Sequence, residues 1–187
     1  MPRKGAAPTS QGNAVSFLSR IFGARLGRDA LQPLYRAIVA RGRDPAWYRD
    51  GEVPDTIDGR FDMIAMLTAL VLLRLEQDEE ARRPSVLLTE TFVADMDSSL
   101  REIGIGDYVV GKHVGRMMGA LGGRLTALRG ARDRAALTAA VERNVFRGAA
   151  PSPEALAFVS ARLDGFRAKL AEAPLDSLLA GTLPGHD

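Results

Sequence analysis

The stretch Met63-Ile64-Ala65-Met66-Leu67-Thr68-Ala69-Leu70-Val71-Leu72-Leu73 decides the fold, because it is the longest apolar run in the chain. Only Thr68 interrupts it, and Asp62 and Arg74 close it at the two ends. A helix that spans a membrane needs about 20 apolar residues. Eleven residues are too few for a span. We therefore expect a buried core helix at about residues 60–77.

Apolar residues on both sides of this run recur at helical spacing, and no segment alternates convincingly at a period of two. In the following segment, Leu88, Phe92, Met96, Leu100 and Ile103 lie three or four positions apart, which places them on one helical face. Further helices are expected at about residues 29–41, 110–128, 133–146 and 153–171, with short ones after Asp44 and Pro174. The pattern predicts an all-α fold, a single-domain bundle of six to seven obliquely packed helices.

Capping residues mark several of the expected helix ends. Asp29, Asp133 and Ser152 stand where a side-chain oxygen can accept a hydrogen bond from the first turn of a helix. Gly42 follows the first of these helices and is placed as its C-terminal stop.

The segment before residue 29 differs from the rest of the chain. Residues 1–14 are rich in Gly, Ala, Pro, Ser and Thr, which is typical of a disordered tail. Residues 15–28 are expected to form an amphipathic basic helix, and residues 29–187 the all-α domain. The helix fits an anionic membrane surface, an organellar transit peptide in a eukaryotic source, or packing on the domain. The residues of the membrane-surface hypothesis are Leu18, Arg20, Ile21, Phe22, Arg25 and Arg28.

Residue composition argues against catalysis. The chain has no cysteine and only two histidines, His113 and His186. The lack of cysteine excludes disulfides, thiolate metal sites and thiol nucleophiles, and the scarcity of histidine leaves few groups for proton transfer at neutral pH. We therefore expect no enzyme activity, no catalytic residue, no metal, no cofactor and no small-molecule substrate.

Charge is segregated along the chain. The net charge is +7 over residues 1–49, −9 over residues 50–107, +6 over residues 108–147 and −2 over residues 148–187. Such blocks suit a macromolecular partner, although they are equally compatible with blocks that neutralise one another within the fold.

One segment has the spacing of a phosphate-binding loop. Gly106 and Lys112 stand in the right positions, but His113 replaces the hydroxyl residue that binds magnesium. Asp107 also puts a carboxylate where backbone amides would hold an anion. We expect a turn between two helices here, with Asp107 as the cap of the second.

Glycines are frequent in the helix expected at residues 110–128. Gly115, Gly119, Gly122 and Gly123 each cost about 1 kcal/mol relative to alanine in a helix interior. Glycine allows another helix or a partner to approach the backbone closely, so this helix is a candidate contact surface.

A family resemblance rests on residues 94–107, which read Ala94-Asp95-Met96-Asp97-Ser98-Ser99-Leu100-Arg101-Glu102-Ile103-Gly104-Ile105-Gly106-Asp107. Arg60-Phe61-Asp62, Arg74-Leu75, Gly123-Arg124 and Arg143-Asn144-Val145-Phe146 fall in supporting positions. Over about residues 30–147 the chain resembles the ubiquinol–cytochrome c chaperone family, and a bacterial member of it. It departs from the family pattern at Leu121-Gly122, where an aromatic pair is common.

The resemblance implies a non-enzymatic, all-α chaperone or assembly factor for the cytochrome bc1 complex (complex III). Its expected partners are newly made cytochrome b or another bc1 subunit, with the ribosome or a small co-chaperone nearby. The matched positions implied as partner-binding are Asp95, Asp97, Arg101, Glu102, Gly104, Gly106, Asp107, Lys112, Gly123 and Arg124. Met117 and Met118 are added because methionine gives adaptable apolar contacts.

An alternative function uses the arginine-rich segments directly, as a peripheral membrane or RNA-binding module. Single-stranded nucleic acid usually stacks on aromatic side chains. Residues 109–145 contain none. The expected location is the cytoplasm, with peripheral contact at the inner membrane, or the mitochondrion in a eukaryotic source.

Overall fold

The computed structural model describes residues 28–102 and 107–185, and the side chains of these residues except 28, 100–102, 107–110 and 112. The described residues form helices and no strand, which confirms the all-α prediction. The elements are η1 (Arg28–Leu31), α2 (Gln32–Gly42), α3 (Ala46–Arg49), α4 (Ile57–Leu75), η2 (Glu79–Ala81), α5 (Arg82–Glu102), α6 (Asp107–Gly130), α7 (Arg134–Val141), the π-helical turn η3 (Glu142–Phe146), α8 (Pro153–Glu172) and α9 (Leu175–Leu179).

The apolar run forms the centre of the core, as predicted. Every residue from Phe61 to Leu72 is buried in α4. The helix begins slightly earlier than expected, because Thr56 caps it by accepting a hydrogen bond from the Gly59 N–H at 3.1 Å. No helix in the described part of the chain is long and apolar enough to cross a membrane.

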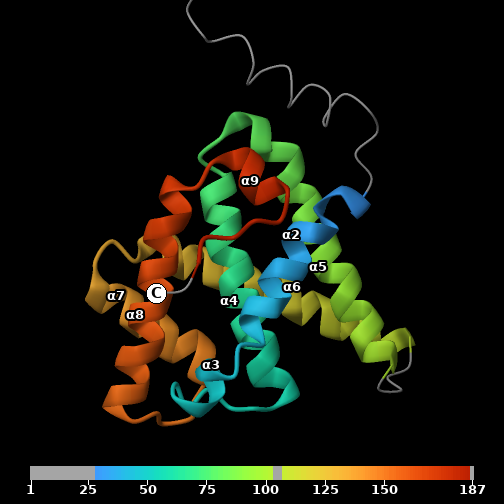
Figure 1. Ribbon diagram of the computed structural model, residues 1–187. Coiled ribbons are helices and arrows are strands. Elements are labelled where there is room, and N and C mark those ends of the chain that lie inside the picture. Colours follow the sequence, from blue (N-terminus) through green and yellow to red (C-terminus); the bar gives the residue numbers. More distant parts are fainter. Residues whose placement is uncertain (1–27, 103–106, 186–187) are drawn as a thin grey trace, which may run out of the picture.

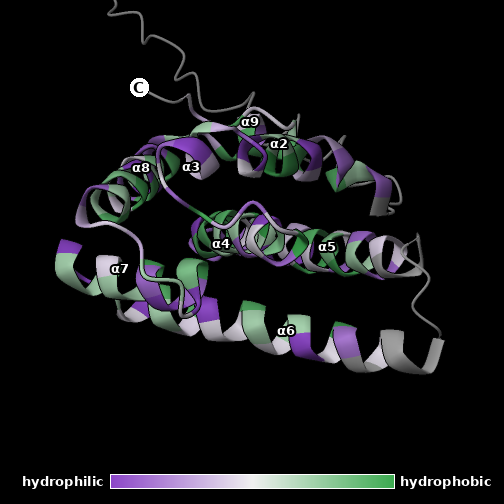
Figure 2. Cartoon of the chain, turned by 90° about the horizontal axis from the view of Figure 1, so that it is seen from below, coloured by the Kyte–Doolittle hydropathy of each residue, from purple (hydrophilic) through white to green (hydrophobic). Residues whose placement is uncertain are grey.

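The helices lie in three layers (Figure 2). α4 and α5 form the middle layer, with α2, α3, α8 and α9 on one side and α6 and α7 on the other. α4 contacts both α2 and α6, and α5 packs against α6 (Figure 1). The middle layer therefore has one helix, α6, along much of one side.

The capping predictions have mixed outcomes. Asp133 accepts from the Ala136 N–H at 2.8 Å and Ser152 from the Ala155 N–H at 3.2 Å, which confirms both caps. The prediction that Asp29 caps the first long helix is wrong. Asp29 lies inside η1, and α2 starts after Leu31 without a side-chain cap.

Gly42 ends α2 for a reason other than the expected one. Its φ is not among the positive values of the chain, so no left-handed stop is needed there. Gly42 is buried instead, and an added Cβ would lie 2.8 Å from Ile64 Cγ1. Close packing of α2 on α4 explains the glycine.

Candidate partner-binding site

The predicted contact residues lie on the last turns of α5, at the start of α6 and farther along α6. Asp95 and Asp97 are half-buried on α5, and the Tyr35 hydroxyl donates a 2.8 Å hydrogen bond to Asp95. Arg101 and Glu102 end α5, and Asp107 and Lys112 lie in the first turns of α6, where no side chains are described. Gly104 and Gly106 lie outside the described residues. α5 packs against α6, but the described members of the set do not share one face, because Asp95 hydrogen-bonds to Tyr35 on the α2 side and Arg124 is buried against α4.

The glycines of α6 share an open face. Gly111, Gly115, Gly119 and Gly122 follow one another at spacings of four, four and three, which aligns them along the helix. A Cβ added at any of them, or at Gly123, meets no atom within 4 Å. Within the described residues, no other element makes the close approach for which glycine is suited.

The two methionines take different positions on this helix. Met118 is 36% exposed, one of the few large apolar side chains at the described surface. Met117 is half-buried and packs against the core. The open face therefore combines bare backbone with one flexible apolar side chain.

The opposite face of α6 holds the helix on α4. Leu121 and Leu128 are buried there, and so is Arg124, which is only 2% exposed. The Arg124 guanidinium pairs with the Asp62 carboxylate on α4 and donates to the Asn144 carbonyl at 2.7 Å. Arg124 was predicted to lie in the contact surface. In the structure it is buried and pairs with Asp62 on the side of α6 that faces α4.

Asp62, which the sequence did not predict to be near the contact surface, lies directly behind α6 as the partner of Arg124. It is 2% exposed, and Arg147 also approaches it, with Nη1 3.3 Å from the carboxylate. Burial raises the pKa of Asp62 and lowers the pKa of Arg124, because a low-dielectric interior disfavours both charges more than their attraction favours them. The available signal was an acid beside an apolar run inside an expected helix, where a charge needs a partner.

The turn after α7 completes this cluster. The sequence predicts one helix up to Phe146, but the last five residues widen into the π-helical turn η3. Arg147 then adopts a left-handed conformation, with φ 45°. The wider turn directs the Asn144 carbonyl at Arg124 and brings Arg147 to Asp62.

The predicted membrane-surface helix has no structural outcome. Leu18, Arg20, Ile21, Phe22 and Arg25 of the predicted membrane-surface helix lie outside the described residues, and the side chain of Arg28 is not described. Among residues 28–102 and 107–185, no group of three His, Asp or Glu side chains is arranged to hold a metal ion.

Comparisons with known proteins show which family and which solved structure the chain is similar to. The model of the ubiquinol–cytochrome C chaperone family matches residues 49–184, a range that starts and ends later than the predicted resemblance. A crystal structure of the Cbp3 homolog from Brucella abortus matches with a TM-score of 0.73 and 30% sequence identity, over 92% of this chain and 96% of that one. None of the curated proteins compared with the chain matches it.

The family match includes α4, α5 and α6, and with them the 94–107 segment, the Asp62–Arg124 pair and the open face of α6. The chain belongs to the ubiquinol–cytochrome c chaperone family.

Proposed function

We propose that this chaperone receives newly made cytochrome b on the glycine face of α6, the surface formed by Gly111, Gly115, Met118, Gly119 and Gly122. Family membership supports a role in assembly of the cytochrome bc1 complex. The observation that carries the proposal is the empty space above all four of these glycines.

The four glycines lower the intrinsic helix propensity of α6. Each glycine costs about 0.5–1 kcal/mol relative to alanine in a helix interior. No contact within the described fold requires glycine at these positions, because alanine would fit at each of them. A function outside the folded chain accounts for their presence.

The chemistry of the face suits a client made of membrane helices. Small residues allow two helix backbones to approach closely, as in packing within membranes. Met118 adds an adaptable apolar contact. α6 has 24 residues. The glycine face runs over 12 of them, from Gly111 to Gly122, which at 1.5 Å per residue is about 17 Å, roughly half the length of a membrane-spanning helix.

The test is a steric block. Gly115→Leu with Gly119→Leu fills the face without touching the core, so we expect a folded protein that no longer supports bc1 assembly in cells lacking the natural gene. Gly165→Leu is the matched control, because Gly165 is also an open helical glycine, but on α8 and without aligned glycines. Assembly is read from the reduced-minus-oxidised absorbance of cytochrome b haem.

Normal haem absorbance in the double variant would contradict the proposal. An equal loss with Gly165→Leu would do the same, since it would trace the effect to bulk on any open helix. Contacts with the ribosome, a co-chaperone or a membrane surface stay predictions.

A further inference from the structure

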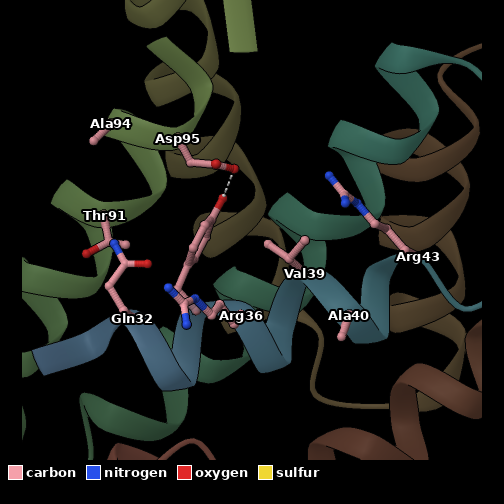
Figure 3. A pocket seen from close by; sticks show the side chains of 9 residues that line it. Gln32, Arg36, Val39, Ala40, Arg43, Thr91, Ala94 and Asp95 are labelled. Carbon is pink, nitrogen blue, oxygen red and sulfur yellow. Dashed lines mark hydrogen bonds between the residues drawn. The ribbon is translucent and has the colours of Figure 1, made fainter. Parts of the chain in front are cut away.

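A second surface lies on the other side of the middle layer, between α2 and α5. It is a groove of about 580 Å³ that is open to solvent (Figure 3). α2 contributes Tyr35 and Arg36 to its lining, Arg43 follows directly after α2, and α5 contributes Thr91 and Asp95. The glycine face of α6 takes no part in it.

Two arginines on the α2 side are exposed and unpaired. Within the part of the chain that the structure describes, neither Arg36 nor Arg43 makes an ion pair or a side-chain hydrogen bond. Nearby Arg49 and Arg60, by contrast, pair with Asp50 and Asp55. Arg36 and Arg43 are seven residues apart, which is about 10 Å along a helix.

The α5 side carries one fixed negative charge. Tyr35 and Asp95 both line the groove, and the Tyr35 hydroxyl donates its 2.8 Å hydrogen bond to Asp95, drawn as a dashed line in Figure 3. Burial raises the pKa of Tyr35 above its ordinary value, so the phenol stays protonated and keeps donating. The lining of the groove therefore contains two positive charges from the α2 side and one carboxylate from α5 that is held by a hydrogen bond.

This charge pattern selects among anionic partners. Guanidinium groups recognise carboxylates and phosphates alike. A polyanion such as RNA, however, would pass its phosphates directly over Asp95, and the flat surface of a membrane does not enter a groove. A peptide carries its negative charges at chosen positions, and in the polyproline-II conformation residues three apart lie on the same side of the chain and about 9 Å from each other.

We propose that the α2–α5 groove binds an acidic segment of a partner protein in the polyproline-II conformation, with carboxylates three residues apart placed on Arg36 and Arg43. Thr91 and Asp95 form the facing wall, where Asp95 accepts from the N–H or basic groups of the peptide between its two acids. This site is independent of the proposed use of α6.

The experiment measures binding of a labelled synthetic peptide with two glutamates three residues apart in a Gly/Ser background, by fluorescence anisotropy at low salt. We expect Arg36→Glu with Arg43→Glu to weaken binding about tenfold or more. The matched control is Arg132→Glu with Arg134→Glu, which changes the net charge equally at two exposed arginines elsewhere. We expect the control to stay within about twofold, because screening limits long-range effects.

A second arm tests spacing and chemistry. A peptide with adjacent glutamates and one with glutamines should both bind more weakly, and amide NMR shifts on adding the first peptide should centre on Thr91 and Asp95. Four results would each overturn the proposal: no binding of the first peptide, an equal loss in the control variant, no dependence on glutamate spacing, or tighter binding of an RNA oligomer or phosphatidylserine vesicles through Arg36 and Arg43. A thermal melt of both double variants shows that each remains folded.

Discussion

α4 and α6 are long neighbouring helices that pack against each other, yet the fold encloses them to different degrees. α4 is buried over every residue from Phe61 to Leu72, while the open side of α6 has exposed glycines along much of its length. Their glycines differ in the same way. An added Cβ at Gly59 of α4 would lie 1.9 Å from the Pro54 carbonyl oxygen, whereas one at Gly119 of α6 meets nothing within 4 Å.

The difference separates two uses of one residue type. Gly59 is required by the fold, because the chain before α4 passes directly over it. The glycines of α6 serve no contact within the described structure. Replacing a glycine that the fold requires should lower the stability of the protein. Replacing a glycine that only a partner contacts should leave the free protein stable and weaken binding of that partner.

The largest expected effect comes from breaking the link between the two helices. Asp62→Ala leaves Arg124 buried without its carboxylate, so we expect a loss of about 3–5 kcal/mol in the free energy of unfolding. Urea denaturation measures it, with Asp58→Ala as the control, because Asp58 is exposed on the same helix. A loss below about 1 kcal/mol would mean that Arg124 relaxes to solvent and that the pair does not hold α6.

Filling the enclosed glycine should have the next largest effect. Gly59→Ala places a methyl group against backbone that cannot move easily, and we expect a loss of about 3 kcal/mol in the free energy of unfolding. A circular-dichroism melt provides the comparison with the wild type. An unchanged melting temperature would refute the view that α4 is packed to its limit here.

The same substitution on α6 should act in the opposite direction. Gly119→Ala adds helix propensity without a clash, so we expect a gain of about 0.5–1 kcal/mol. This corresponds to a rise of about 1–4 °C in Tm for a chain of this size. Destabilisation would show that α6 packs against something in the free protein and would remove the contrast with Gly59.

The smallest effect concerns the pKa of Asp62. Burial raises it and the guanidiniums of Arg124 and Arg147 oppose the rise, so Arg147→Gln should raise it further. A raised folded-state pKa means that the folded protein holds its proton to higher pH than the unfolded chain. Asp62 therefore contributes stability at low pH that is lost as pH rises through the folded-state pKa. Carboxyl NMR titration checks the direction; a fall in the pKa in Arg147→Gln would contradict it.

Local features of the sequence predicted much of the fold. The apolar run at residues 63–73 identified the core helix, and Asp133 and Ser152 marked helix starts, because such signals act within a few residues. The π-helical turn before Arg147 was not predicted, since its contacts are with α4 and α6 rather than with its own neighbours.

The candidate site was predictable only in part. The glycines of α6 were recognisable, but whether they face a neighbouring helix or open space depends on tertiary packing. Arg124 was placed at the surface because its partner Asp62 lies 62 residues earlier in the chain. The Tyr35–Asp95 hydrogen bond joins residues 60 apart, so the α2–α5 groove carries no local signature.

The contrast between α4 and α6 is tested most directly by photo-crosslinking in cells that are synthesising cytochrome b. A photoreactive amino acid replaces Met118 on α6 or, in the matched variant, Ile57 on α4, and both native side chains are exposed and apolar. The account predicts that the Met118 variant captures newly made cytochrome b and the Ile57 variant does not. Capture from both positions equally, or from neither, would contradict the assignment of the α6 face as the client surface.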